Sequence, residues 1–303
     1  MNRVVSNLSR WCATTLFVTM VACHRSPSSR GTSDLVKVDS GSVAVDGGHL
    51  FYEVAGSGTP IVLIHGGNVD RRMWDDQFMA FAREHRVVRY DLRGYGRSSP
   101  ETGSFEAHRD LHALMLSLGL RQASLVGLSG GGRIAIDFAL VFPEMVDRLV
   151  LVAPGISGWS FAPDDTSWYA EGRVMRDRGD SVGVAVAWAN HSFYTRMVMA
   201  KPRLAERMRH IVGDNASHFM GRVRHGDLER DAQPPALGRT AGIRVPTLLL
   251  VGDRDVPDIL KIADTLSASV PGIRRESFPG VGHFVNMERP ADFTRVVLAF
   301  LRE

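Results

Sequence analysis

Short apolar runs alternate with amphipathic stretches along most of this chain, and this alternation restricts the possible folds more than any other feature. Eight runs have the length and composition of strands, and they lie at Ser42–Val45, Leu50–Val54, Ile61–His65, Val87–Asp91, Ser124–Leu128, Leu149–Ala153, Thr247–Val251 and Arg274–Phe278. Several are unbroken Val, Ile and Leu runs, which are typical of strands buried on both faces of a parallel sheet. Helical patterns lie between them, at Phe105–Leu118, Gly130–Val141, Asp258–Val270 and Arg289–Leu301. This order predicts an α/β fold with a mostly parallel sheet.

The alternation stops between about residues 155 and 240. That stretch contains three or four helical segments, is rich in Arg, Met, Trp and His, and has no convincing strand. We interpret it as a helical insertion over the edge of the sheet. The predicted organisation is therefore a core of residues 42–154 and 241–303 with a helical cap of residues 155–240. The first two strands are joined through Asp46-Gly47-Gly48, which predicts a hairpin.

The composition excludes several classes of protein. With 44% hydrophobic and 23% charged residues, the chain is neither collagen-like, nor disordered, nor a multi-span membrane protein. Its 36 basic and 33 acidic residues give a net charge of +3 without a basic block, so we expect no nucleic-acid partner. Both cysteines, Cys12 and Cys23, lie near the N-terminus, so no disulfide framework supports the body of the protein.

Residues 1–22 have the pattern of an export signal. Two arginines and no acidic residue accompany the apolar stretch Trp11–Ala22, which is too short to span a bilayer. The stretch ends in Met20-Val21-Ala22-Cys23, which resembles the bacterial lipoprotein signal, although Met20 stands where leucine is usual. A polar run rich in Ser, Arg and Pro follows, and we interpret residues 23–41 as a flexible tether.

The lipoprotein resemblance implies that Cys23 carries lipid and holds the exported protein on a membrane surface of a bacterial cell. A signal that is simply cleaved would instead give a periplasmic or secreted protein. An uncleaved anchor or a misassigned start are further alternatives.

A G-x-S-x-G sequence at Gly127, Ser129 and Gly131 follows a strand and opens a helix. In this setting the serine is held on a strained turn, and the glycines leave room for that turn. The N–H groups at the start of the helix point toward developing negative charge. We therefore predict that Ser129 is a nucleophile.

A serine hydroxyl is a poor nucleophile until a base takes its proton, and the base needs an acid to orient it. His283 lies in a glycine-rich loop directly after the last strand. Asp255 follows the preceding strand, where a loop can reach across the carboxyl edge of the sheet. Asp253 and Asp258 are weaker candidates for the acid.

From residue 42 to its end, the sequence resembles an α/β-hydrolase with a helical cap, similar to the enol-lactonase-like and small-esterase branches. Besides the chain order Ser, Asp, His, a strand leads into His65-Gly66-Gly67, and Asp91–Ser98 matches the signature D-x-R-G-x-G-x-S. Asp110–Leu120 matches the helix that leads to the nucleophile strand. The resemblance implies an eight-stranded, mostly parallel sheet flanked by helices.

The resemblance also assigns roles. Ser129 would attack a carbonyl carbon, His283 would accept and return its proton, and Asp255 would hold the imidazole in its productive tautomer. The backbone N–H groups of Gly67 and Gly130 would form the oxyanion hole, with Asn68 as an alternative to Gly67. His65 is expected to be a structural residue of its turn.

These roles imply a serine hydrolase that cleaves a carboxylic ester or lactone of a small acyl substrate through an acyl-enzyme, without a cofactor. Carbon–carbon bond hydrolysis, peroxide-dependent chemistry and aminopeptidase activity also use a serine here and remain alternatives. A non-catalytic surface binding module is a further one. The sequence makes no prediction about the oligomeric state.

Two other patterns are interpreted as structural. His108 and His112 are four residues apart but lack the glutamate of the zinc-protease motif, so we expect a solvated helix face and no metal site. The aromatic residues of the cap should mostly pack it against the sheet, with a minority touching substrate. They are Trp159, Trp168, Tyr169, Trp188, Phe193, Tyr194 and Phe219.

Overall fold

The computed structural model describes residues 36–161, 174–175, 177–192, 194–218 and 228–303. The predicted export signal and Cys23 lie outside the described residues, so they stay predictions. Four of the aromatic residues predicted for the cap also lie outside them, namely Trp168, Tyr169, Phe193 and Phe219.

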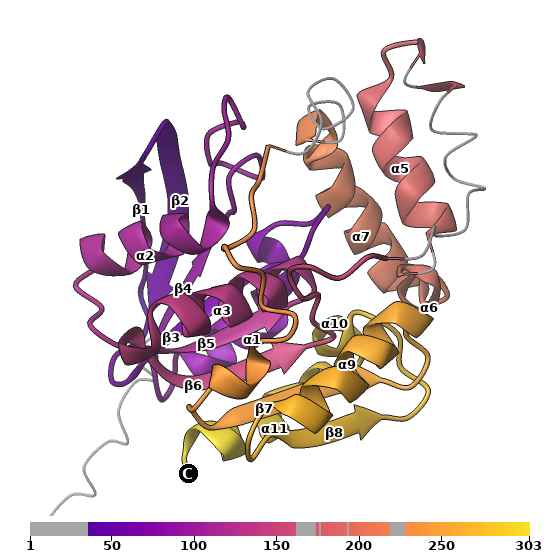
Figure 1. Ribbon diagram of the computed structural model, residues 1–303. Coiled ribbons are helices and arrows are strands. Elements are labelled where there is room, and N and C mark those ends of the chain that lie inside the picture. Colours follow the sequence, from indigo (N-terminus) through magenta and orange to yellow (C-terminus); the bar gives the residue numbers. More distant parts are fainter. Residues whose placement is uncertain (1–35, 162–173, 176, 193, 219–227) are drawn as a thin grey trace, which may run out of the picture. The chain divides into compact units, whose positions relative to one another are not determined.

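Eight strands in the described part of the chain form one sheet, in the order β1-β2-β4-β3-β5-β6-β7-β8 (Figure 1). They are β1 (Val38–Val45), β2 (Gly48–Ala55), β3 (Pro60–Ile64), β4 (Arg86–Tyr90), β5 (Ala123–Leu128), β6 (Val146–Val152), β7 (Thr247–Gly252) and β8 (Arg274–Phe278). The β1–β2 and β2–β4 pairs are antiparallel, and the other neighbours are parallel. The eight predicted strands and the α/β class are therefore confirmed.

The first strand begins earlier than predicted. β1 starts at Val38, four residues inside the range interpreted as a tether. The hairpin itself is confirmed, because Val45 pairs with Gly48 around a turn at Asp46 and Gly47. Gly47 has a φ of 73°, in the left-handed region that glycine adopts without steric cost.

Side chains alternate along each central strand and bury both faces of the sheet. All six residues of β5 are buried. Leu125 lies in the core layer that contains residues of α2, α3 and α9, whereas Val126 and Leu128 lie in the layer that contains residues of α1 and α11. The unbroken apolar runs in the sequence are what this two-sided burial requires.

Helices connect the strands much as predicted. Outside the cap they are α1 (Asp75–Phe81), α2 (Ala107–Ser117), α3 (Gly130–Val141), α9 (Pro257–Ser269), α10 (Val285–Glu288) and α11 (Pro290–Leu301). The four predicted helices correspond to α2, α3, α9 and α11, with ends that differ by at most two residues. The prediction missed α1 and α10, because seven and four residues are too few to display the helical period.

Helices α5 (Ser181–His191), α6 (Arg196–Met199) and α7 (Pro202–Asp214) lie between β6 and β7, within the range predicted as a cap. α5 and α7 are in contact, and α7 buries one apolar face. The exact limits of the cap stay a prediction. Among the described helices, none combines the length and the apolar composition that crossing a membrane requires.

Candidate active site

Ser129 stands where the buried strand β5 turns into helix α3, as the N-cap residue of that helix. Its backbone has φ 55° and ψ −115°, a conformation that costs a non-glycine residue about 1–3 kcal/mol. Backbone hydrogen bonds maintain it: Ser129 N–H donates to the Val152 carbonyl at 2.9 Å, and its carbonyl accepts from Arg133 and Gly155 at 3.0 Å. The predicted strand–turn–helix context of Ser129 is therefore confirmed.

Both glycines of the G-x-S-x-G sequence are required by close backbone contacts. A Cβ at Gly127 would lie 2.3 Å from the carbonyl oxygen of Gly131. A Cβ at Gly131 would lie 2.2 Å from the carbonyl oxygen of Ile64, in the neighbouring strand β3. Real Cβ atoms do not approach backbone oxygens this closely, so only glycine allows β3, β5 and α3 to meet here.

Gly131→Ala should destabilise the protein by about 3 kcal/mol or more, the upper end of the usual cost of overpacking, because backbone must move to admit the methyl group. The measurement is the free energy of unfolding from denaturant titration. Gly213→Ala in α7 is the matched control, because nothing lies within 4 Å of its added Cβ. It should be neutral or stabilise by about 0.5–1 kcal/mol. Equal effects of the two substitutions would contradict the steric argument.

Asp255 and His283 lie in the loops after β7 and β8, and their side chains are in contact. His283 Nδ1 is 2.9 and 3.0 Å from the two carboxylate oxygens of Asp255, and both residues are buried. A carboxylate only accepts hydrogen bonds, so Nδ1 carries a proton, and in the neutral ring Nε2 then keeps its lone pair. This is the tautomer that a general base for Ser129 needs.

Backbone contacts fix these two loops against each other. Arg254 N–H donates to the Val281 carbonyl at 2.9 Å, and a Cβ at Gly252 would lie 2.2 Å from that same oxygen. Beside His283, Gly282 N–H donates to the Glu288 carboxylate at 3.1 Å. Burial raises the pKa of the Glu288 carboxyl. Asp255 and His283 are therefore carried by loops that are held together.

The weaker acid candidates contact other groups. Asp253 Oδ1 accepts from Gly280 N–H at 2.7 Å, and Asp258 lies 3.5 Å from Lys261 Nζ. The geometry thus supports Asp255 as the orienting acid for His283.

The backbones of Gly67 and Gly130 approach each other beside Ser129. A Cβ at Gly130 would lie 3.5 Å from the Gly67 nitrogen. Gly130 opens α3, so its N–H has no acceptor within the helix. The Gly67 N–H has no acceptor among the described residues, whereas the Asn68 N–H donates to the Tyr95 hydroxyl at 3.3 Å. This difference favours Gly67 over Asn68 as the second oxyanion donor.

His65 is a buried structural residue whose tautomer follows from its contacts. Leu92 N–H donates to His65 Nε2 at 2.9 Å, so Nδ1 carries the proton and donates to the Gly66 carbonyl at 2.7 Å. Burial lowers the pKa of His65 and favours the neutral ring. In a trans peptide the C=O and N–H point in opposite directions, so this bond also sets the direction of the Gly67 N–H.

The D-x-R-G-x-G-x-S sequence supports the loop after β4. The Asp91 carboxylate accepts from Arg71 at 2.8 and 3.0 Å, and a Cβ at Gly96 would lie 2.3 Å from it. Arg93 forms a two-point ion pair with Asp110 of α2, at 2.8 and 3.0 Å. These buried contacts pair Asp91 and Arg93 of the motif with opposite charges, so the motif stabilises the loop after β4.

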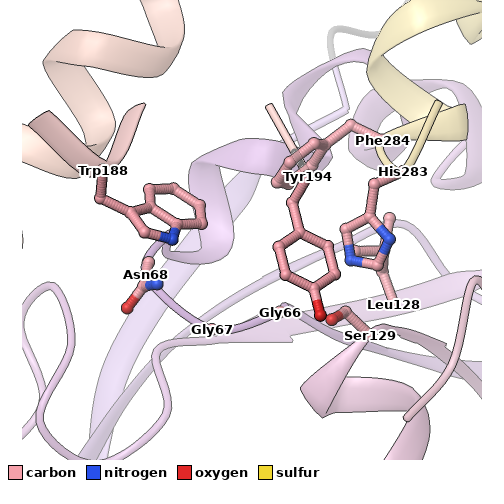
Figure 2. A pocket seen from close by; sticks show the side chains of 9 residues that line it. All are labelled: Gly66, Gly67, Asn68, Leu128, Ser129, Trp188, Tyr194, His283 and Phe284. Carbon is pink, nitrogen blue, oxygen red and sulfur yellow. The ribbon is translucent and has the colours of Figure 1, made fainter. Parts of the chain in front are cut away.

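A cavity of about 110 Å³ contains Ser129 and His283 in its wall (Figure 2). Its lining is Gly66, Gly67, Asn68, Leu128, Ser129, Trp188, Tyr194, His283 and Phe284. Figure 2 shows Ser129, His283 and Tyr194 at one end and Trp188 with Asn68 at the other. The Tyr194 ring meets the His283 ring edge to face, with centroids 4.8 Å apart. Two of the predicted cap aromatics therefore line this cavity.

Leu128 and Phe284 were not singled out from the sequence. Each is the chain neighbour of a predicted catalytic residue, Ser129 or His283, and this adjacency is the signal that would have identified them.

A second cavity, of about 580 Å³, adjoins the first at Gly67. Its lining includes Gly130, Tyr95, His218 and the predicted cap aromatic Trp159. Its wall also carries an ion-pair cluster in which Arg133 of α3 contacts Glu229 and Asp231. The two cavities beside Gly67 thus differ in size and polarity.

The histidines of α2 are not on a solvated face, so that prediction was wrong. His108 is buried, and the ring of His112 stacks on Phe142 with centroids 4.2 Å apart, because the end of α3 packs over α2. No cluster of three or more metal-ligating side chains occurs in the described part of the chain.

Comparison with known proteins relates this geometry to a family. A family model for the alpha/beta hydrolase fold matches residues 59–290, a range that contains Ser129, Asp255 and His283. The chain is 28% identical over 254 residues to the carboxylesterase YbfK of Bacillus subtilis, and the match covers 80% of this chain and 79% of that protein.

Two further proteins that are similar to this chain are named for other substrates. The chain is 31% identical over 281 residues to a 2-hydroxy-6-oxononadienedioate/2-hydroxy-6-oxononatrienedioate hydrolase of Burkholderia vietnamiensis, covering 86% of this chain and 94% of that protein. The crystal structure of the enol-lactonase from Burkholderia xenovorans is similar with a TM-score of 0.69 at 24% identity, covering 87% of this chain and all of that chain. The structural likeness shows a shared fold.

Proposed function

The chain belongs to the alpha/beta hydrolase fold family, and we propose that it is a serine hydrolase that cleaves a carboxylic ester or a lactone through an acyl-enzyme. One observation carries this proposal. Ser129, in a strained N-cap conformation, and His283, paired with the buried Asp255, line the same cavity (Figure 2). A buried imidazole oriented by a carboxylate beside a serine at a helix N-terminus is suited to acyl transfer.

The reaction follows from these positions. Ser129 Oγ attacks the carbonyl carbon while His283 Nε2 accepts the hydroxyl proton. The N–H groups of Gly67 and Gly130 stabilise the charge on the carbonyl oxygen, and each such donor contributes roughly 10²–10³ in rate. His283 then protonates the departing alkoxide. In the second half of the reaction a water molecule attacks the Ser129 ester while His283 accepts its proton, and His283 returns that proton to Ser129 Oγ as the carboxylic acid leaves. Asp255 stabilises the imidazolium in both halves of the reaction.

The two cavities differ in their lining, and we propose that each binds a different part of the substrate. Trp188, Tyr194 and Phe284 give the smaller cavity aromatic walls suited to a short apolar group. The larger cavity, which shares Gly67 with the smaller one, presents charged side chains and suits a polar group. We therefore favour an ester or lactone that carries one small apolar group and one polar group.

Carbon–carbon bond hydrolysis is the second candidate. The relative from Burkholderia vietnamiensis, at 31% identity, is a hydrolase of a dioate whose name indicates carboxylate groups at both ends.

A fluorophosphonate probe combined with a substrate panel tests the proposal. The panel contains short acyl esters, lactones, vinylogous diketones and aminoacyl amides. We expect the probe to label the protein and the esters or lactones to give the highest kcat/KM. Fastest turnover of the diketones would identify the second candidate, and fastest turnover of the amides an aminopeptidase. If neither labelling nor turnover occurs, a binding module is the better description.

A further inference from the structure

We propose that Tyr95 and His218 are positioning residues that fix the oxyanion donor Gly67, and that they couple the segment after α7 to the reaction. The inference rests on the proposed function, because it takes the Gly67 N–H to be an oxyanion donor. Tyr95 belongs to the loop after β4, and His218 follows the end of α7 by four residues.

Gly67 lies between two peptide groups, and a side chain holds each of them. His65 Nδ1–H donates to the carbonyl of the peptide before Gly67, at 2.7 Å. The Tyr95 hydroxyl accepts from the N–H of the peptide after it, that of Asn68, at 3.3 Å. Gly67 has no Cβ and Asn68 has a φ of 64°, so this stretch needs outside contacts to keep one conformation. With both peptides held, the Gly67 N–H keeps its direction.

Tyr95 is itself fixed by two histidine rings. The His65 ring meets it edge to face, with centroids 5.1 Å apart and an interplanar angle of 80°. His218 Nε2 lies 2.6 Å from the Tyr95 hydroxyl, and the two ring centroids are 3.9 Å apart. Tyr95 and His218 are each only 6% exposed, so little water competes for these contacts.

The direction of the hydrogen bonds follows from Glu101. Its carboxylate lies 3.5 Å from His218 Nδ1, which favours the proton on that nitrogen. Nε2 then accepts from the Tyr95 O–H, and the tyrosine oxygen keeps its lone pairs for the Asn68 N–H. Donation therefore runs from Asn68 to Tyr95 to His218, and each bond polarises the next.

The segment that carries His218 is anchored to the core. The buried side chain of Asn215 donates to the Asp70 carboxylate at 2.8 Å and accepts from Gly96 N–H at 2.7 Å. Asp70 and Gly96 lie in the loops after β3 and β4, the same loops that carry Gly67 and Tyr95. A shift of the end of α7 would thus reach the oxyanion donor through His218.

Tyr95→Phe removes the hydroxyl and keeps the ring. Since complete loss of an oxyanion donor costs about 10²–10³ in kcat, loosening one should lower kcat for a short acyl ester by roughly 10-fold or more. KM should stay within about twofold, because this donor acts mainly in the transition state. A trifluoromethyl ketone, whose adduct with Ser129 places an oxyanion in the hole, should bind more weakly by the same factor as kcat falls.

His218 provides a second, conservative pair of variants. His218→Leu should lower kcat like Tyr95→Phe, whereas His218→Gln, whose terminal amide can still bond the tyrosine hydroxyl, should keep most of it. This pair decides the question if Tyr95→Phe does not fold. Tyr52→Phe in β2 and His210→Leu on the exposed side of α7 are matched controls and should keep wild-type kinetics.

Unchanged kcat and ketone affinity in Tyr95→Phe would overturn the inference. A rise in KM alone would also overturn it and identify Tyr95 as a substrate-binding residue of the larger cavity, which it lines. These outcomes leave the proposed function intact as long as the wild-type protein turns over esters. A wild-type protein that neither reacts with the probe nor turns over the panel would overturn both.

Discussion

Replacing Ser129 with alanine should lower kcat for a short acyl ester by about 10⁶-fold, the loss found when a triad nucleophile is removed, and should abolish labelling by a fluorophosphonate. The nucleophile, base and acid act as a unit, so His283 and Asp255 have nothing to activate once the hydroxyl is gone. The fold should persist, because backbone groups hold the turn: Ser129 N–H donates to Val152, and its carbonyl accepts from Arg133.

Ser124→Ala is the matched control for this experiment. Ser124 is a buried serine of β5, the strand that leads to Ser129, and its hydroxyl donates to Asp147 at 3.2 Å, away from the cavity. That variant should keep its turnover and its labelling. If Ser129→Ala still reacts with the probe, the nucleophile is another residue.

Asp255→Asn should lower kcat by about 10⁴-fold, the loss known for the same change in another triad. Asp255 Oδ1 accepts from Val256 N–H at 2.7 Å, so the amide oxygen of asparagine should take that position and its NH₂ should face His283. The NH₂ would donate to Nδ1 and move the ring proton to Nε2, which then cannot accept the proton of Ser129. Steady-state kinetics, with circular dichroism to check folding, give the result.

Asp253→Asn tests whether any carboxylate in this loop is sufficient. Asp253 accepts from Gly280 N–H through one oxygen, and the amide oxygen can replace it. Turnover should therefore change by no more than a few-fold, roughly the effect of a surface substitution. Near-normal turnover in Asp255→Asn would mean that a different group orients His283.

Sequence pattern was sufficient for the central fold because both faces of the sheet are buried. Val, Ile and Leu fill most of β3 and β7, and all six residues of β5 are buried, so helices that separate such apolar runs make the strands easy to recognise. The start of β1 was missed because the residues from Val38 to Gly41 are mostly exposed and include only one large apolar side chain, as an edge strand allows.

Some residues of the candidate site were likewise predictable from the sequence, and others were not. Ser129, Asp255 and His283 were predicted because each follows a strand, and parallel strands end at one edge of the sheet. The contact of Tyr95 with His218 was not, since it depends on where α7 ends in space rather than on local sequence. The burial of His108 was missed for the same reason: Phe142 comes from another helix.

At residue 129, stability and the proposed activity make opposite demands on the side chain. A φ of 55° suits glycine, so Ser129→Gly would relieve a strain of about 1–3 kcal/mol and remove the hydroxyl in the same step. Mutation filtered only for folding would drift toward glycine here, and the turnover that we propose for Ser129 is what would oppose that drift. The stability of the fold therefore does not explain why residue 129 is a serine, whereas the proposed reaction does.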